Sequence, residues 1–137
     1  MSLGLKLTTI TTALLIAGSV FAEEPICPNL SDIQAVGINM ASQLGYDLYV
    51  GYTVNDYNTS STWTFGIGPV EADSDEDAID ISNDILADMS GPGVPTESDG
   101  QMLCVYETGD PNLFAVGIKD FEGMSPMKFK QYMHKAH

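Results

Sequence analysis

The chain contains two cysteines, Cys27 and Cys104, and a bond between them would restrict the fold more than any other feature. Such a bond would close a loop of about 78 residues, for which the chain-entropy account gives about 4.5 kcal/mol of stabilisation. The alternative is a free nucleophilic or metal-binding thiol. Neither cysteine has a histidine near it in sequence, and the chain has no Cys-x-x-Cys motif. The sequence therefore favours a disulfide.

The first 22 residues have the features of a secretory signal peptide. They combine a positive start at Lys6, an apolar run over residues 7–17 and the small-residue ending Val20-Phe21-Ala22. We expect cleavage before Glu23 and export to a periplasm or beyond, where oxidising surroundings let the two cysteines pair. An uncleaved membrane anchor is the alternative. The apolar run is too short to cross a bilayer comfortably, so we predict no stable membrane insertion.

Charge excludes several classes of partner. The chain has 5 Lys plus Arg, all of them lysines, against 19 Asp plus Glu, and a formal net charge of −14. Nucleic acids and anionic membrane surfaces are bound by clustered Lys and Arg, so we predict neither as a partner. The absence of arginine also removes the usual bidentate clamp for phosphate or carboxylate substrates.

Two segments have the spacing of amphipathic helices. In the first, Ser31 and Gln34 fit a capping box, apolar residues then recur at helical spacing as far as Leu44, and Gly45 is placed to end the helix. The second covers residues 73–89 and begins with acids that suit a helix N-terminus. Its predicted cap is Ser74 with Asp77, and its predicted buried stripe is Ala78, Ile81, Ile85 and Met89.

Four segments alternate like half-buried strands, namely residues 48–54, 62–67, 102–107 and 113–118. Residues 90–100 are rich in glycine and proline and predict a loop. The sequence thus predicts an α+β fold, a four-stranded antiparallel sheet packed by two helices in the order α-β-β-α-β-β, with one disulfide.

We divide the chain into a signal peptide (1–22), a single α+β domain (23–118) and a C-terminal tail (119–137). The tail holds four lysines, three methionines and both histidines. We interpret it as an appendage to the core that becomes helical from Met127 onward.

The sequence offers weak signals for metal binding and catalysis. Asp73, Asp75 and Asp77 resemble the start of a calcium loop, but Ala78 and Asp84 stand where glycine and glutamate are needed. We favour a helix start and predict no metal site. Residues 1–133 contain no histidine, which argues against histidine-dependent catalysis. We therefore predict that the protein is not an enzyme.

Two groups of side chains are candidates for binding. Acids recur at +3, +4 and +4 along the second helix without a lysine to offset them, and they form a solvated face or a docking surface for a basic partner. These acids are Asp77, Asp80, Asp84 and Asp88. Tyr49 and Tyr57 either pack in the core or line an apolar groove for a flat ligand.

Short motifs along residues 25–118 resemble a small family of exported Gram-negative proteins of unknown function, one of which is described as hemin-binding. The motifs are Cys27-Pro28, Ile33-Gln34-Ala35-Val36-Gly37, Asn58-Thr59-Ser60-Ser61-Thr62-Trp63-Thr64-Phe65, Gly91-Pro92, Cys104-Val105-Tyr106 and Phe114-Ala115-Val116. The tail from Lys119 lies outside this resemblance.

The resemblance implies hemin as a ligand, which would need an apolar slot and axial ligands for iron. The residues of suitable type are Tyr49, Tyr57, Met133, His134 and His137. The anionic propionates of hemin would be repelled by so acidic a chain. The sequence predicts a secreted, non-catalytic binding protein, and the resemblance makes hemin its leading ligand. The alternative is an interaction module that uses the acidic helix face.

Overall fold

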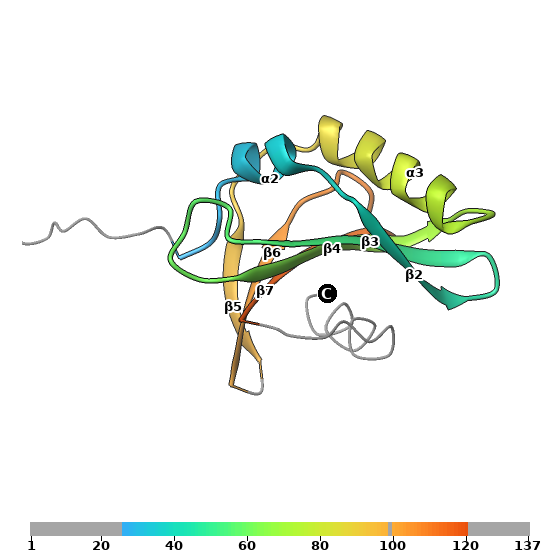
Figure 1. Ribbon diagram of the computed structural model, residues 1–137. Helices are drawn as coiled ribbons and strands as arrows, with labels where there is room; N and C mark the ends of the chain where they lie inside the picture. The colour runs from blue at the N-terminus through green and yellow to red at the C-terminus, as the bar shows by residue number, and fades with distance from the viewer. Residues whose placement is uncertain (1–25, 99, 121–137) are drawn as a thin grey trace, which may run out of the picture.

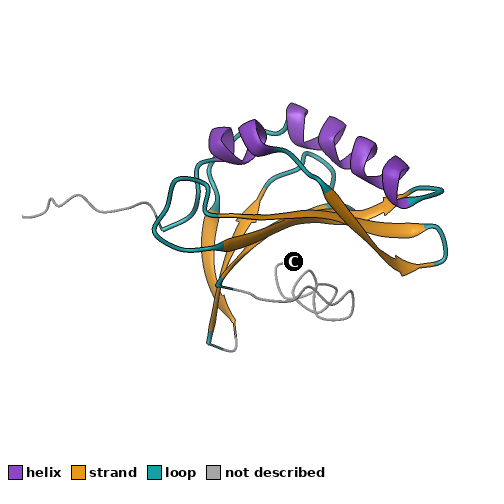
Figure 2. Cartoon of the chain, viewed as in Figure 1, coloured by secondary structure: helices purple, strands orange, loops and turns teal. Residues whose placement is uncertain are grey.

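The computed structural model describes residues 26–98 and 100–120, so the predicted signal peptide and the tail beyond Asp120 lie outside the described residues. The described chain forms one antiparallel sheet with both helices on the same face (Figure 1, Figure 2). The elements follow one another as α2 (Leu30–Val36), β2 (Met40–Gly45), β3 (Leu48–Asn55), β4 (Trp63–Glu71), α3 (Asp75–Asp88), β5 (Val94–Ser98), β6 (Gln101–Tyr106) and β7 (Phe114–Lys119).

The sheet has six strands in the order β2-β3-β4-β7-β6-β5, and all neighbours are antiparallel. The predicted four-stranded sheet and the order α-β-β-α-β-β are therefore wrong, because the observed order is α-β-β-β-α-β-β-β. The strands missing from the prediction, β2 and β5, are the edges of the sheet, while β4 and β7 lie at its centre.

Strand β2 occupies residues that the sequence assigned to the first helix. That helix ends early at Gly37, which has a φ of 81° and donates its N–H to the carbonyl of Ile33 at 2.9 Å. Glycine adopts this left-handed conformation without steric cost, and it is a common helix terminator. The chain beyond it is then extended, and Met40 pairs with Tyr52 of β3.

Strand β5 occupies part of the segment predicted as a loop. It pairs with β6 from Val94 opposite Val105 to Ser98 opposite Gln101, and it includes Pro95. Proline lacks a donor N–H, but an edge strand needs hydrogen bonds on one side only and tolerates it. Pro95, which favoured a loop in the sequence, is thus compatible with a strand at the edge of the sheet.

Of the two predicted helix caps, the second is confirmed and the first is wrong. The Ser74 hydroxyl accepts a hydrogen bond from the N–H of Asp77 at 3.1 Å at the start of α3. At the start of α2 the N-cap is Asn29, which makes no side-chain capping bond. Gln34 instead reaches the end of α3, where its Nε2 donates to the carbonyls of Leu86 and Met89 at 2.9 and 3.1 Å.

The main core lies between the helices and the sheet. Trp63, Phe65 and Ile67 share one face of β4, as their alternation predicted, and they pack in this core with Ile33 of α2 and Leu86 of α3. The predicted disulfide is present at its edge. It joins Cys27, before α2, to Cys104 in β6, with a Cα–Cα distance of 5.7 Å.

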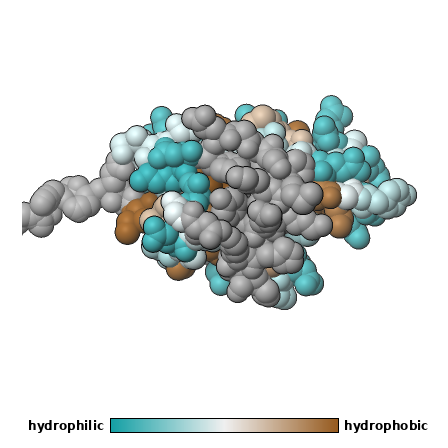
Figure 3. All heavy atoms as spheres, turned by 90° about the horizontal axis from the view of Figure 1, so that it is seen from below, coloured by the Kyte–Doolittle hydropathy of each residue, from teal (hydrophilic) through white to brown (hydrophobic). Residues whose placement is uncertain are grey.

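We call the sheet face opposite the helices the back face. Its centre carries a second cluster, the back-face cluster, consisting of Val50, Leu103, Val116 and Ile118. Figure 3 shows the molecule from this side, with hydrophobic residues at the surface next to hydrophilic ones. Neither helix in the described part of the chain has the length and apolar character that a membrane span requires.

Candidate functional site

The outer side of α3 carries a continuous row of exposed carboxylates. Three of the four predicted acids, Asp80, Asp84 and Asp88, are exposed, whereas Asp77 is half-buried. The Oδ2 of Asp77 accepts a hydrogen bond from the N–H of Asp73 at 3.1 Å, so this side chain belongs to the helix start.

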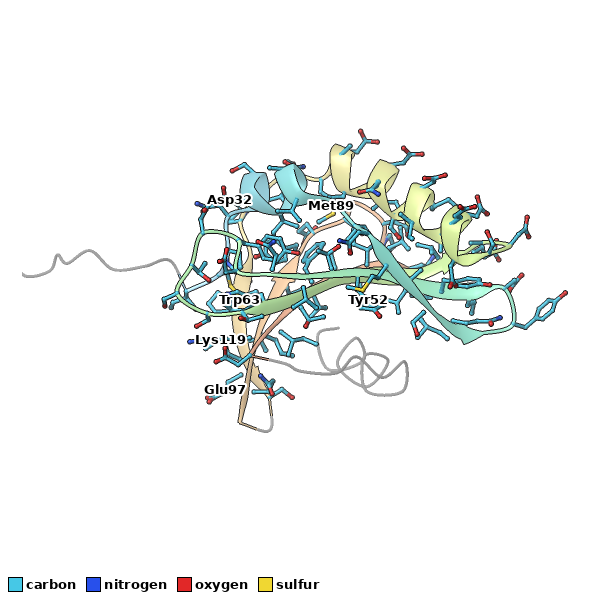
Figure 4. The ribbon with its side chains drawn as sticks, in the orientation of Figure 1. Asp32, Tyr52, Trp63, Met89, Glu97 and Lys119 are labelled. Atoms are coloured by element: carbon cyan, nitrogen blue, oxygen red, sulfur yellow. A yellow bond between two sulfur atoms is a disulfide. The ribbon has the colours of Figure 1, made fainter. Side chains whose placement is uncertain are left out.

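Glu76 extends the row in the other direction, because it is exposed and lies four residues before Asp80. We missed Glu76 in the sequence, although the same four-residue spacing pointed to it. We define the acidic face of α3 as Glu76, Asp80, Asp84 and Asp88. Residues four apart lie on one side of a helix, so the row runs for about 18 Å. Figure 4 shows the side-chain oxygens along the outer side of α3 pointing away from the sheet.

The opposite side of α3 sets the direction of the acidic face. Ala78, Ser82 and Leu86 are buried against the sheet, and Ile81 and Ile85 are half-buried beside them. The buried stripe is thus rotated from the predicted one towards Ser82. Gly51 of β3 makes this close packing possible, since a Cβ there would lie 2.2 Å from the Ser82 hydroxyl oxygen.

Polar side chains hold α3 in this orientation. The Oδ1 of Asn83 accepts from the N–H of Ile38 at 2.9 Å, and its Nδ2 donates to the Ile38 carbonyl at 3.0 Å. These bonds tie α3 to the segment that joins α2 to β2, and the bonds of Gln34 tie the end of α3 to α2 itself. The carboxylates are therefore presented by a fixed helix.

No cation among the described residues lies near the acidic face. Within residues 26–98 and 100–120, Lys119 is the one positively charged side chain, and Figure 4 shows it well away from α3. The last turn of α3 contains no basic residue, although the helix dipole favours one there. Asp88 stands at that end instead, where the dipole disfavours a negative charge.

Of the two alternatives for Tyr49 and Tyr57, a place in the core or in an apolar groove, the structure shows the core. Tyr49 is 7% exposed and packs with Val70 and Ala78, while Tyr57 is 2% exposed and belongs to the main core. They lie in different clusters and do not face a common groove. Met133, His134 and His137, the other predicted ligand residues, lie outside the described residues.

Two of the depressions in the described surface are well defined, and neither of these contains a predicted ligand residue. One of about 390 Å³ lies at the turn between β6 and β7 and is lined by residues 105–111, 113 and 114. The other, of about 300 Å³, lies beside Cys27 and is lined mainly by apolar residues, including Ile26, Leu30 and Pro92. In the part of the chain that the structure describes, no three His, Cys, Asp or Glu side chains group closely enough to hold a metal ion.

The comparisons with known proteins give one match. A family model described as "Domain of unknown function (DUF4949)" matches residues 26–132. No curated protein and no solved structure matches the chain. The family match continues beyond residue 118 into the segment that we predicted to be an appendage.

Proposed function

The chain belongs to the DUF4949 family, whose function is unknown, and from this premise we propose that it is an exported, non-catalytic interaction module that docks a basic partner protein on the acidic face of α3. The observation that carries the proposal is the exposure of four carboxylates in one row, without a cation beside them among the described residues.

The row of like charges lowers the stability of α3 taken by itself. Like charges four residues apart destabilise a helix by a few tenths of a kcal/mol for each pair, and Asp88 adds an unfavourable interaction with the helix dipole. The buried side of α3 already supplies the packing that holds the helix on the sheet. A basic partner surface would turn this repulsion into attraction, and this supports the proposal.

The chemistry of the row suits a partner that presents Lys or Arg at a similar spacing over about 18 Å. Complementary charge mainly accelerates association and makes binding sensitive to salt. The disulfide is typical of an oxidising compartment and supports export. Both cysteines are in the disulfide, and the described residues include no histidine, which supports a role without nucleophilic catalysis.

Hemin binding draws less support from the described residues. Tyr49 and Tyr57 are committed to packing, which leaves Met133, His134 and His137 as its predicted ligands. Titration of the protein with hemin tests it separately. A Soret shift in the unmodified protein that is lost in a His134→Ala/His137→Ala variant would favour hemin as the ligand.

The acidic face is tested with a synthetic helical peptide whose lysines are spaced four residues apart. We compare Asp80→Asn/Asp84→Asn with Glu97→Gln/Glu107→Gln. The second pair makes the same change in net charge at exposed positions outside α3. We expect the first variant to bind the peptide roughly three- to tenfold more weakly, since exposed ion pairs contribute up to about 1 kcal/mol each.

The control variant should bind the peptide nearly as well as the unmodified protein, and high salt should weaken binding of all three. Equal affinities for the two variants would show that the effect is one of net charge only. Binding that does not respond to salt would exclude the acidic face as the docking surface.

A further inference from the structure

The back-face cluster is more deeply buried than the described elements explain. Val50, Leu103, Val116 and Ile118 are all 0% exposed, and Leu44 and Phe114 pack against them partly buried. Every one of these residues lies on a strand, and both helices cover the other face of the sheet (Figure 1). An apolar sheet face is stable in water only beneath another layer. The described residues supply that layer on one side only.

We propose that the C-terminal segment, residues 121–137, is the missing layer, and that it docks as an amphipathic helix on the back-face cluster. The protein is then a three-layer domain of helices, sheet and C-terminal helix. This inference concerns the face opposite α3 and is independent of the proposed function.

The position and length of the segment fit this role. It follows β7, which lies between β4 and β6 at the centre of the sheet and itself supplies Val116 and Ile118. Ser125 followed by Pro126 is typical of a helix start, with serine as the cap and proline in the first turn. A helix from Pro126 to the chain end would be about 18 Å long, close to the length of a six-residue strand.

The sequence of the segment has one apolar side. Phe129, Tyr132, Met133 and Ala136 follow the +3, +4, +7 spacing that places them together on a helix. Gln131 and His134 fall on the opposite side of the same helix. The segment thus carries an apolar stripe of the kind that a sheet face can bury.

Charge favours contact between the segment and the rest of the chain. Residues 121–137 contain Lys128, Lys130 and Lys135 but a single acid, Glu122. Among the described residues, in contrast, Lys119 is the sole base against many acids. The segment and the sheet domain therefore attract each other.

The family match supports the same conclusion independently. It continues to residue 132 and so includes Phe129 and Tyr132 of the apolar stripe. A segment within the family's shared domain is expected to pack with it.

Nuclear magnetic resonance of the isotope-labelled protein tests the contact directly. We expect nuclear Overhauser effects from the rings of Phe129 and Tyr132 to the methyl groups of Val116 and Ile118. Mixed labelled and unlabelled samples distinguish contacts within one molecule from contacts between two. Effects seen only between molecules would mean that a second copy covers the face, and methyl groups without any contact to the tail would also overturn the proposal.

A pair of variants tests the energetic role of the stripe. Met133→Asp places a charge on the apolar side, and Gln131→Asp makes the same kind of change on the opposite side. We expect Met133→Asp to lower Tm by roughly 5 °C or more, because charging a buried position is costly, and Gln131→Asp to leave Tm almost unchanged. Equal Tm values for the two variants would contradict docking through this stripe.

Discussion

At the scale of single residues, Ser82 and Gly51 set the distance between α3 and the sheet. A Cβ on Gly51 would lie 2.2 Å from the Ser82 hydroxyl oxygen and 2.7 Å from its Cβ, so any larger side chain would push the helix away. The Ser82 hydroxyl is fully buried and has no hydrogen-bond partner among the described residues. The small size of Ser82 therefore allows α3 to pack close to the sheet, while its unpaired hydroxyl destabilises the fold.

We expect Ser82→Ala to raise the free energy of unfolding by about 1 kcal/mol, because it removes an unpaired buried hydroxyl and also favours the helix. Ala87→Ser is the matched control, because Ala87 is exposed on the same helix and reports the helix-propensity part alone. Urea denaturation of both variants measures the difference. If Ser82→Ala gains no more than Ala87→Ser loses, the hydroxyl carries no burial penalty.

Two buried phenols predict how stability depends on alkaline pH. Burial raises the pKa of Tyr57 and of Tyr106 well above the ordinary value of 10.0, and for Tyr106 the nearby Tyr57 raises it further. Both groups remain protonated in the folded protein, whereas they ionise in the unfolded chain above about pH 10. Their contribution to stability is therefore complete below that pH and is lost as pH rises above it.

Each tyrosine should lower the free energy of unfolding by up to about 1.4 kcal/mol per pH unit above pH 10. Urea midpoints measured across this range give the slope, which should be shallower in Tyr57→Phe. Tyr46, which is 91% exposed, provides the control, since Tyr46→Phe should leave the slope unchanged. A slope that Tyr57→Phe does not alter would mean that this phenol ionises equally in both states.

At the scale of elements, local patterns predicted the structure where local interactions decide it. The alternation in β3, β4, β6 and β7 and the Ser74 cap of α3 are local, and all of them appear in the structure. Three of these strands lie within about one residue of the predicted bounds, whereas β4 continues beyond its predicted end to Glu71. The conformation of residues 38–45, in contrast, depends on residues that are distant in the sequence. Their apolar residues have helical spacing, but Gly37 ends the helix before them. Hydrogen bonds with Asn83, which lies 45 residues away from Ile38, then hold the chain in another conformation.

Asn83 should thus stabilise the turn into β2 as well as the packing of α3. Its replacement by alanine leaves the N–H and carbonyl of Ile38 without their partner, and unpaired groups of this kind cost about 1–3 kcal/mol each. We expect Asn83→Ala to accelerate hydrogen–deuterium exchange at the Ile38 amide and to lower the urea midpoint. Asp84→Ala, at the next and exposed position, should leave exchange at Ile38 unchanged and should not lower the urea midpoint, because it only removes repulsion along the acidic face. Unchanged exchange at Ile38 would show that the bonds do not hold the turn.

At the scale of the whole molecule, the candidate site was predictable in part. The periodicity of α3 located Asp80, Asp84 and Asp88 on its exposed side. Strand alternation, however, shows only that Tyr49 and Val50 point in opposite directions, and both turned out to be buried. The sequence does not reveal that both faces of β3 are covered, since the layer over each face comes from distant residues. Tyr49, which the sequence left open between the core and a groove, is for this reason found in the core beneath α3.

The bond between Cys27 and Cys104 links the start of the domain to β6 across most of the described chain. Opening this loop enlarges the unfolded ensemble, so Cys27→Ala/Cys104→Ala should lose about 4.5 kcal/mol of stability, much of what a domain of this size possesses. Its urea unfolding should also show a larger m-value, because the unfolded chain exposes more surface.

Tyr106→Phe is the control: it removes only the 2.7 Å hydrogen bond from the Tyr106 hydroxyl to the Pro28 carbonyl between the same segments. It should cost about 1–3 kcal/mol without changing the m-value. A double alanine variant with an unaltered m-value and a loss no greater than that of Tyr106→Phe would show that the bond restrains the unfolded chain far less than its loop length implies.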